Sequence, residues 1–259
     1  MMHSYPVKPL VIIPTYNERE NVRNLIPAIL DLHSTLSILV VDDSSPDKTA
    51  DIVFEMQKHG YDGRLFLISQ PGKHGLGRAY INGFKWGLAA GHDFLIEMDA
   101  DWSHPPKYLV TMLHLAKEMD FVVASRYMKG GGTLNWGIGR RLLSRFGSLY
   151  SRMVLGMYFS DFTGGFNGWS ADVLSQIGLN AFQSNGYGFQ IELKYRATKL
   201  GFRHIEFPFV FDERRSGKSK MSAVIALEAF WRVWQVRFDS GFKTRDANLA
   251  NETLKRLIG

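Results

Sequence analysis

The most informative stretch of this 259-residue chain is Phe94-Leu95-Ile96-Glu97-Met98-Asp99-Ala100-Asp101. Its apolar beginning is typical of a short buried strand, and two aspartates one residue apart follow directly. In parallel α/β sheets, the carboxyl ends of the strands form the edge where ligands bind. Because a divalent cation that carries phosphates takes one or two carboxylates as ligands, we expect Asp99 and Asp101 to bind such a cation there, and we expect Asp101 to be exposed. The alternative is a surface turn in which both aspartates only cap the following helix.

Strand-like and helix-like segments alternate around this stretch. We expect strands at residues 10–13, 37–41, 65–68, 94–98, 121–124 and 204–209. We expect helices at residues 21–32, 49–58, 78–89, 105–117, 140–155 and 189–200. Such alternation is the signature of βαβ units. The sequence therefore predicts an α/β fold with a Rossmann-like, mostly parallel sheet flanked by helices.

The end of the chain has a different pattern. Residues 221–239 read as an amphipathic helix with a narrow polar stripe, and Trp231, Trp234 and Phe238 lie among its other, apolar positions. Such a helix either packs over the core or lies in a membrane interface, where Trp and basic residues are favoured. We predict one catalytic domain over residues 1–220, followed by a helical, membrane-interfacial segment over residues 221–259.

The composition and the missing motifs exclude several classes of protein. The chain has no Cys, which excludes disulfide scaffolds, thiolate zinc sites and cysteine nucleophiles. The fingerprints of dinucleotide-binding proteins, P-loop NTPases, zinc metalloproteases and serine hydrolases are also missing from the sequence. We find neither a signal-peptide pattern nor an apolar run of about 18 residues, so we expect a cytosolic chain without a transmembrane helix.

A second acidic pair, Asp42-Asp43, follows the expected strand at residues 37–41. Since both strands end at the same sheet edge, a carboxylate here is placed to accept hydrogen bonds from a nucleotide; an ordinary turn before Pro46 is the alternative. The loop at residues 72–77 contains three glycines and precedes a helix. Its backbone N–H groups are candidates for binding phosphate, although the loop alone is weak support.

Positive charge is concentrated in one segment. The chain has a formal net charge of +6, and residues 121–160 contain no acidic residue but do contain Arg126, Lys129, Arg140, Arg141, Arg145 and Arg152. This segment is either a solvated basic surface or a site for phosphate. A second basic cluster at residues 212–220 is either a solvated loop or a lid over a phosphorylated ligand.

Several stretches, in order along the chain, resemble family 2 glycosyltransferases with the GT-A fold. They are Val11-Ile12-Ile13-Pro14-Thr15-Tyr16-Asn17-Glu18, Val40-Val41-Asp42-Asp43-Ser44-Ser45, Gly75-Leu76-Gly77, Met98-Asp99-Ala100-Asp101-Trp102-Ser103-His104-Pro105 and Gly164-Gly165-Phe166. The fourth stretch and the late Ser219-Lys220-Met221-Ser222 narrow the resemblance to polyprenol (dolichol) phosphate mannose synthases. The similarity runs from about Pro9 to Ser222.

The resemblance implies roles for individual residues. It places Pro14, Tyr16, Glu18, Asp43 and Asp99 around the nucleotide sugar, with Arg214 and Lys220 on a loop above it. It places Mg²⁺ or Mn²⁺ on Asp99 and Asp101, and Ser103 occupies a position where some relatives have a stronger Gln ligand. It assigns the acceptor phosphate to Arg126, Arg140 and Ser144, and catalysis to Asp101, Arg126 and Arg140. Gln190 and Glu192 are expected to be structural.

The implied reaction transfers mannose from GDP-mannose to a polyprenyl phosphate with inversion. The second pKa of a phosphate monoester is about 6, so the acceptor oxygen is already anionic and needs no general base. The resemblance also implies peripheral attachment to the cytoplasmic face of a membrane, directly or through a membrane-anchoring partner. A glucosyl or N-acetylglucosaminyl transferase that uses a UDP-sugar is the alternative within the same class. A nucleic-acid-binding module has only the basic charge in its favour and none of the expected motifs, so we expect no nucleic-acid partner.

Overall fold

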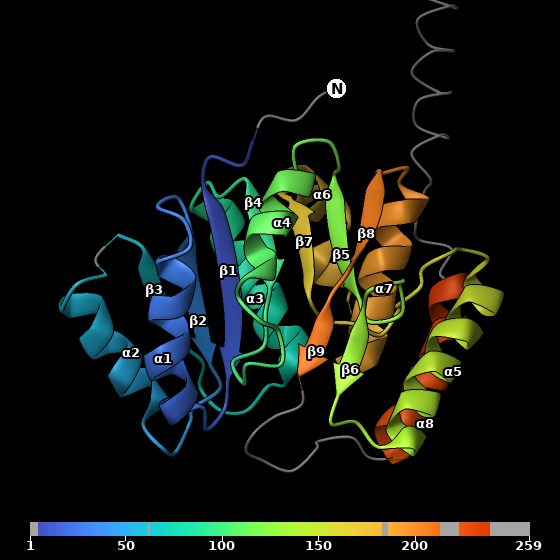
Figure 1. The fold of residues 1–259 in the computed structure, drawn as a ribbon, viewed down its shortest axis with the longest axis horizontal. Helices are drawn as coiled ribbons and strands as arrows, with labels where there is room; N and C mark the ends of the chain where they lie inside the picture. Colours follow the sequence, from blue (N-terminus) through green and yellow to red (C-terminus); the bar gives the residue numbers. More distant parts are fainter. Residues whose placement is uncertain (1–4, 62, 183–185, 213–222, 239–259) are drawn as a thin grey trace, which may run out of the picture.

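A sheet of seven strands forms the centre of the protein, for which the computed structural model describes residues 5–61, 63–182, 186–212 and 223–238. The strand order is β3-β2-β1-β4-β7-β5-β8 (Figure 1). The strands are β1 (Pro9–Thr15), β2 (Ser37–Asp42), β3 (Leu65–Ser69), β4 (Phe94–Glu97), β5 (Phe121–Ser125), β7 (Asn167–Ser170) and β8 (His204–Pro208). All neighbouring strands in this sheet run parallel except at β7. The predicted α/β fold is confirmed.

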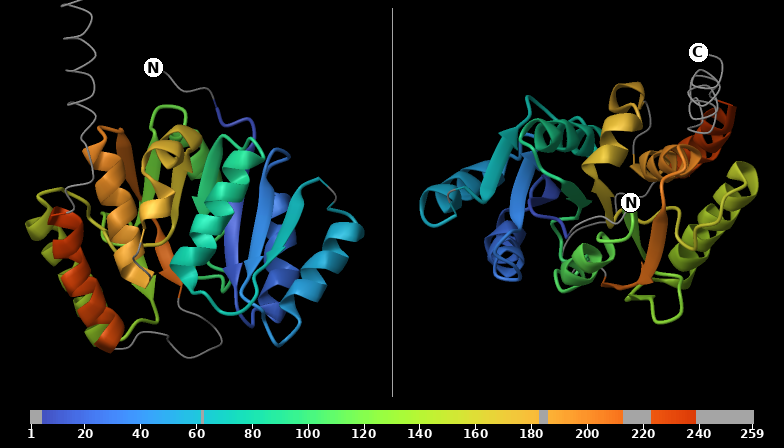
Figure 2. Two further views of the ribbon diagram at one scale, coloured as in Figure 1. Left: turned by 180° about the vertical axis from the view of Figure 1, so that it is seen from behind. Right: turned by 90° about the horizontal axis from the view of Figure 1, so that it is seen from above.

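Helices cover both faces of this sheet (Figures 1 and 2). One face carries α1 (Arg19–Leu30), α2 (Thr49–Lys58) and α4 (Tyr108–Leu115). The other carries α3 (Leu76–Ala89), α6 (Ala171–Gln176) and α7 (Gly186–Lys199), with a short 3₁₀ turn (Leu179–Ala181) between the last two. At the β8 end of the sheet, α8 (Ala223–Phe238) packs against α7 and against α5 (Ile138–Leu155). The predicted C-terminal helix is therefore present.

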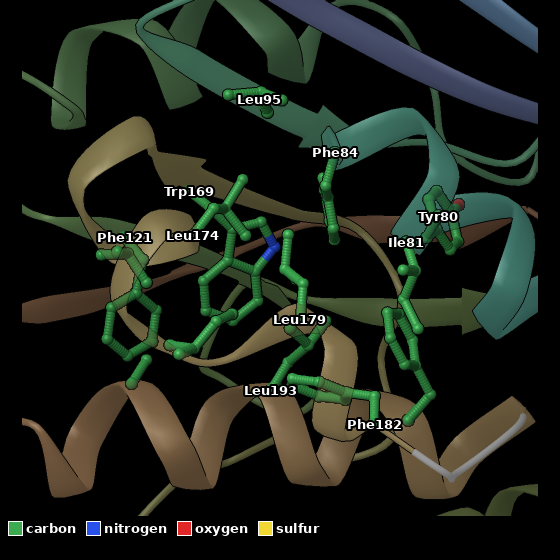
Figure 3. Close-up of a cluster of buried hydrophobic side chains, with 14 of the residues drawn as sticks. Tyr80, Ile81, Phe84, Leu95, Phe121, Trp169, Leu174, Leu179, Phe182 and Leu193 are labelled. Atoms are coloured by element: carbon green, nitrogen blue, oxygen red, sulfur yellow. The ribbon is translucent and has the colours of Figure 1, made fainter. Parts of the chain in front are cut away.

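The alternation of side chains along β1 supplies two separate cores. Leu10 and Ile12 pack into the core beneath α3 and α7, whereas Val11 and Ile13 pack into the core beneath α1 and α4. All four side chains are fully buried, as expected for a central parallel strand covered on both faces. Figure 3 shows part of the first core, where Phe84 of α3, Trp169 of β7 and Leu193 of α7 gather.

The antiparallel strand β7 was not expected from the sequence. It contains only four residues, Asn-Gly-Trp-Ser, and neither Asn nor Gly favours a strand. Its position depends on its neighbours, because Gly168 pairs with Ile96 of β4 on one side and with Val122 of β5 on the other. These partners lie far away in the sequence, so no local sequence pattern predicts the strand.

Several predicted elements have different bounds in the structure, and two of these differences have an identifiable cause. The helix expected at residues 105–117 begins only at Tyr108, because a turn in which the Tyr108 backbone N–H donates to the Pro105 carbonyl comes first. The strand expected at 204–209 ends at Pro208, which has no N–H to donate to the sheet. The chain then forms β9 (Val210–Asp212), which pairs in parallel with β6 (Gly132–Leu134) in a small second sheet. The predicted domain boundary between residues 220 and 221 lies outside the described residues.

The packing at Gly168 generates a prediction about stability. A Cβ atom there would lie 2.5 Å from Cε1 of the Phe94 ring and 2.9 Å from the Met112 sulfur. We therefore expect Gly168→Ala to lower the free energy of unfolding by about 1–3 kcal/mol, because the ring must leave its position. Urea denaturation measures this change. Gly132→Ala is the matched control, since a Cβ atom there meets nothing within 4 Å, and equal stability of the two variants would contradict the prediction.

Candidate active site

The carboxyl ends of β1, β2 and β4 meet at one edge of the sheet. The strand β1 lies between the other two, with Thr15 opposite Asp42 and Ile12 opposite Glu97. Within two to five residues of the end of each of these strands stands a residue other than glycine in the left-handed region: Asn17 (φ 61°), Ser44 (φ 56°) and Trp102 (φ 67°). Such backbone strain is uncommon and collects at functional sites. The strained backbone after these three strands therefore indicates a functional site rather than ordinary connecting loops.

The first acidic pair shapes the loops of this edge. Asp42 is buried and accepts hydrogen bonds from Thr15 Oγ1 (2.7 Å) and from the Ser45 backbone N–H (2.9 Å). Asp43 is also buried and accepts from the backbone N–H groups of His74 (3.2 Å) and Gly75 (2.9 Å), at the start of α3. A carboxylate at a helix N-terminus is stabilised by the helix dipole. Asp43 thus fixes the glycine-rich loop next to the site.

Asp99 faces neutral hydrogen-bond donors. Its side chain is 34% exposed, and the Tyr80 hydroxyl donates to its Oδ1 at 3.5 Å. The backbone N–H of Asp99 donates to His104 Nδ1 (3.0 Å), so that ring carries its proton on Nε2, 3.9 Å from Asp99 Oδ2. Burial lowers the pKa of His104, and burial followed by the charge of Asp99 raises the pKa of Tyr80. Both neighbours are therefore neutral at physiological pH, and neither places a positive charge beside Asp99.

Asp101 is less accessible than the sequence predicts. Only 8% of its surface is exposed, so the expectation of an exposed side chain is wrong for this aspartate. The physical reason is the left-handed Trp102, which turns the chain so that the Ser103 backbone N–H donates to Asp101 Oδ1 at 3.1 Å. Asp99, in contrast, is partly exposed.

The donor atoms at this turn fit a hard divalent cation. Mg²⁺ and Mn²⁺ prefer oxygen ligands, and two carboxylates suffice when phosphates complete the coordination. Ser103 Oγ is fully buried and has no hydrogen-bond partner among the described residues, which marks it as a further oxygen at this turn. Within the described part of the chain, no group of three or more His, Asp or Glu side chains forms a complete metal site. A cation bound here would therefore take its remaining ligands from the phosphates of a substrate.

The residues expected around the nucleotide lie at the end of β1. Pro14 and Tyr16 are partly exposed there, and Lys73 Nζ of the glycine-rich loop lies 3.9 Å above the Tyr16 ring. Glu18 precedes α1 and accepts from Asn21 Nδ2 at 2.7 Å. Arg214 and Lys220, the residues predicted for the loop above the donor, lie outside the described residues.

Arg126, at the end of β5, is held by a buried carboxylate. Its Nε and Nη2 atoms donate to the two carboxylate oxygens of Asp161 at 2.6 and 2.7 Å. Burial opposes the ionisation of Asp161, but the charge and hydrogen bonds of Arg126 outweigh it and hold the pKa of Asp161 below its usual value. The same Nη2 donates to Thr163 Oγ1 (2.9 Å), which lies 3.1 Å from Ser144 Oγ of α5.

Trp136 brings the second predicted arginine to the same place. The guanidinium carbon of Arg140 lies 4.2 Å from the centre of the Trp136 ring, and that of Arg126 lies 5.1 Å from it. Cations are attracted to the face of an indole ring. The structure therefore brings together Arg126, Arg140 and Ser144, the three residues predicted for the acceptor phosphate.

The sequence analysis missed a buried polar network that joins β4, β7 and α7. Glu97, the last residue of β4, accepts from Asn167 Nδ2 (2.9 Å), Gln190 Nε2 (2.9 Å) and Trp169 Nε1 (3.1 Å). Burial raises the pKa of Glu97 to about 7, even though these hydrogen bonds oppose the shift. A charged residue in an apolar strand was the available signal, but its partners could not be identified from the sequence. Gln190 has the structural contacts expected of it.

Lys194 of α7 completes this network. Its side chain is fully buried, and Nζ donates to the carbonyl oxygens of Phe162 (3.1 Å) and Gly164 (2.7 Å). Burial lowers the pKa of Lys194 to about 8, although the carboxylates of Asp161, Glu97 and Glu206 counteract the shift. Lys194 thus fixes the segment that carries Asp161 and Thr163, the two residues that hold Arg126 in place.

Removal of this buried amine should destabilise the protein. We expect Lys194→Met to lower the free energy of unfolding by about 3–5 kcal/mol, because two carbonyl groups lose their donor and the nearby carboxylates lose a buried counter-charge. Thermal and urea denaturation measure the effect. Lys85→Met is the control, since Lys85 is exposed on α3, and a Lys194→Met protein as stable as this control would show that the network is dispensable.

Comparisons with known proteins identify the family of the chain. Residues 10–178, more than half of the chain, match the family described as Glycosyl transferase family 2. An undecaprenyl-phosphate mannosyltransferase from Micrococcus luteus is 43% identical over 220 residues, which cover 85% of this chain and 90% of that enzyme. A polyprenol monophosphomannose synthase from Mycolicibacterium smegmatis is 42% identical over 231 residues, covering 88% and 87% of the two chains.

Solved structures share the fold at lower sequence identity. Glucosyl-3-phosphoglycerate synthase from Mycobacterium tuberculosis superimposes with a TM-score of 0.65 at 18% identity, covering 90% of this chain and 82% of that one. A mannosyltransferase from Pyrobaculum calidifontis in complex with GDP-Man and Mn²⁺ gives a TM-score of 0.57 at 16% identity, covering 99% and 83%. The predicted GT-A-like fold is thereby confirmed. The chain belongs to glycosyl transferase family 2, and the relatives that it resembles over most of its length are polyprenyl-phosphate mannosyltransferases.

Proposed function

We propose that this enzyme transfers mannose from GDP-mannose to a polyprenyl phosphate, with inversion at the sugar carbon. The names of the two relatives that are 42–43% identical support the acceptor class and the sugar. The observation that carries the proposal is the grouping of Arg126, Arg140 and Ser144 around Trp136 and Thr163. Such a group suits a phosphate with a negative charge.

The two ends of the site have complementary tasks. Asp99, Asp101 and Ser103 would hold Mg²⁺ or Mn²⁺, which would supply positive charge against the departing diphosphate. Pro14, Tyr16, Glu18 and Asp43 would line the nucleotide, and Arg214 and Lys220 would close over it. Inversion follows if the acceptor oxygen attacks the sugar carbon opposite the departing diphosphate in a single step.

The acceptor requires positioning more than activation. A phosphate monoester is anionic at neutral pH because its second pKa is about 6, so its oxygen needs no general base. Arg126 is held rigidly by Asp161, and Arg140 rests on the Trp136 ring. Rigid donors lose little entropy when they bind and orient the nucleophile. The arrangement therefore suits transfer to a phosphate better than transfer to a sugar hydroxyl.

A polyprenyl acceptor places the reaction at a membrane. Among the described residues, no helix combines the length and the apolar character that a bilayer crossing needs. We therefore propose peripheral attachment at the cytoplasmic face, directly or through a membrane-anchoring partner. The predicted interfacial segment at residues 221–259 begins with α8, and Trp231 and Phe238 of this helix are exposed.

Transfer of radiolabelled sugar into a lipid extract tests the proposed reaction. We expect label from GDP-mannose in the presence of polyprenyl phosphate and Mn²⁺, and little or none from UDP-glucose or UDP-N-acetylglucosamine. Preferred use of a UDP-sugar would contradict the proposed donor but retain the acceptor. Asp101→Ala should reduce transfer by about a hundredfold or more, because the metal loses a negatively charged carboxylate ligand.

Two further variants separate charge from folding at Asp101. Asp101→Asn can still accept the hydrogen bond from the Ser103 backbone N–H, so it should keep the turn and still lose activity. Asp51→Asn, at an exposed position of α2, should behave like the wild type. Full activity of Asp101→Asn would refute the metal-binding role.

Arg140→Ala tests the acceptor end. We expect this change to raise the KM for the lipid acceptor by about tenfold or more while the KM for GDP-mannose changes little, because a charge-assisted hydrogen bond to the acceptor is lost. Steady-state kinetics with each substrate varied in turn measure both constants. Arg23→Ala, at an exposed position of α1, is the control. Equal increases in the two KM values would count against a role in acceptor binding.

A further inference from the structure

Trp136 is a buried residue within an exposed stretch of the chain. Around the turn between β6 and α5, the residues Leu134, Asn135, Gly137 and Ile138 are all exposed, whereas only 7% of the Trp136 surface is exposed. The residue before it, Asn135, has a left-handed backbone (φ 59°), which is uncommon outside glycine. A large side chain buried at a strained turn is either an anchor that packs the turn or part of a site.

The faces of the Trp136 ring attract two cations. The guanidinium carbons of Arg140 and Arg126 lie 4.2 and 5.1 Å from the ring centre. The Phe211 ring of β9 meets the indole nearly edge to face, with 5.2 Å between the ring centres and 67° between the ring planes. An aromatic ring is negative on its faces and positive at its edge, and the edge of an indole carries the N–H. Trp136 therefore gathers two arginines and still has a hydrogen-bond donor to offer.

This indole N–H has no hydrogen-bond partner among the described residues. A buried indole N–H usually finds a partner, as it does in Trp169, the other tryptophan that is more than nine-tenths buried. Its Nε1 donates to Glu97 Oε2 at 3.1 Å. Because a buried donor without a partner costs free energy, each such group in a folded protein requires an explanation. A ligand that supplies the missing acceptor atom is one explanation.

The alternative is a weak N–H···π contact with Phe211, since the two rings meet edge to face. Trp136 would then be a packing residue. This alternative does not explain why Arg126 and Arg140 share the ring, because like charges repel one another. Asp161 pairs with Arg126 on the side that it occupies. An anion bound between the two arginines would relieve their repulsion, which favours a ligand.

The donors around the ring match a tetrahedral oxyanion. Arg126 and Arg140 carry charged N–H groups, and Ser144 carries a hydroxyl that lies 3.1 Å from Thr163 Oγ1. Trp136 adds a neutral N–H. A phosphate monoester offers three strong acceptor oxygens, whereas a carboxylate offers two. The number and the kinds of donors therefore favour a phosphate.

We propose that Nε1–H of Trp136 donates a hydrogen bond to an oxygen of a phosphate monoester bound between Arg126 and Arg140. Nε1 is closed to solvent in this structure. The partly exposed side chain of Arg140 can slide along the ring face to admit the phosphate and remain on the ring. The inference rests on the proposed function only in identifying this phosphate as that of the lipid acceptor.

Nuclear magnetic resonance of the full chain with isotope-labelled tryptophan tests the hydrogen bond. The chain has six tryptophans, and Trp136→Phe identifies the indole signal that belongs to Trp136. The probe is geranyl phosphate, and geraniol is the control that lacks the phosphate. We expect the Trp136 indole proton to shift downfield with geranyl phosphate, because it then binds an anion, and to stay in place with geraniol. A Trp136 signal that does not move at saturating geranyl phosphate would overturn the proposal.

Affinity and kinetics measure what the bond contributes. Trp136→Phe keeps an aromatic face for the arginines and removes the N–H. We expect it to bind geranyl phosphate about tenfold more weakly and to raise the KM for the lipid acceptor about tenfold, while the KM for GDP-mannose changes little. Trp86→Phe makes the same change where the ring packs on Phe66 and His92, and should behave like the wild type. Equal affinity of Trp136→Phe and the wild type for geranyl phosphate would refute the role.

A further variant tests the packing alternative. If the N–H of Trp136 rests on the Phe211 ring, Phe211→Leu will move the Trp136 signal without any ligand, and Trp136→Phe will bind geranyl phosphate normally; the proposal is then wrong. Circular dichroism shows whether each variant is folded. If Trp136→Phe does not fold, single Trp→Phe variants at the other five positions assign the Trp136 signal by elimination, and the titration of the wild type decides.

Transfer assays separate this inference from the proposed function. Movement of the Trp136 signal by geranyl phosphate, together with no transfer of mannose to any prenyl phosphate, would support the inference and refute the proposed function. Transfer by the wild type, together with an unmoved Trp136 signal and an unchanged acceptor KM in Trp136→Phe, would support the proposed function and refute the inference.

Discussion

The buried ion pair between Arg126 and Asp161 is the contact on which the β5 side of the molecule depends. Asp161 is fully buried, and the removal of a carboxylate from water is costly unless its oxygens are paired with good geometry. Arg126 supplies two short hydrogen bonds, and the Gly164 backbone N–H donates a third at 2.9 Å. The pair therefore joins the end of β5 to the segment before β7 in one arrangement. A buried pair of this kind adds specificity more than net stability.

The site separates its charges along the sheet. The carboxylates of Asp99 and Asp101 stand at the β4 side, and the guanidinium groups of Arg126 and Arg140 stand at the β5 side. Both proposed substrates carry negative phosphates, which repel one another. A cation on the carboxylates and fixed arginines opposite them would compensate each substrate separately, and such preorganised charges cost no reorganisation during the reaction. The buried contacts of Glu97 and Lys194 are not part of this task and hold the two sides in register.

The sequence analysis succeeded where local patterns determine structure. The apolar runs that end in Asp42 and Asp99 predicted the parallel strands, because buried parallel strands must be continuously apolar. The residues of the acceptor group came from the family resemblance, since nothing in the spacing of Arg126 and Ser144 brings them together. The polar network escaped because its hydrogen bonds join residues as distant as Glu97 and Gln190, 93 positions apart. The buried state of Asp101 escaped because it depends on the backbone angle of Trp102.

The helix α5 shows a different limit of sequence reading. The sequence analysis singled out its basic residues and predicted only that the segment is helical, without saying which side its apolar residues occupy. Periodicity indicates that a helix has two faces, but it does not indicate which face meets the core. The small side chains of Ser148 and Ser151, which allow α5 to approach the rest of the domain, are the decisive residues. Because serine is not hydrophobic, a hydrophobicity pattern does not identify these two residues as the ones that face the core.

The reversed direction of β7 has a consequence for how such enzymes diversify. The chain leaves the sheet after β5 and returns to it at β7, and these two strands are direct neighbours, with Val123 opposite Asn167. Everything between them, including α5, is an excursion whose entrance and exit lie side by side. An excursion of this type can be lengthened, shortened or exchanged while the strands proposed to bind the nucleotide keep their order. With the proposed division of the site, new acceptor molecules can be acquired by replacing a single continuous piece of the gene, without any change to the part proposed to recognise the sugar donor.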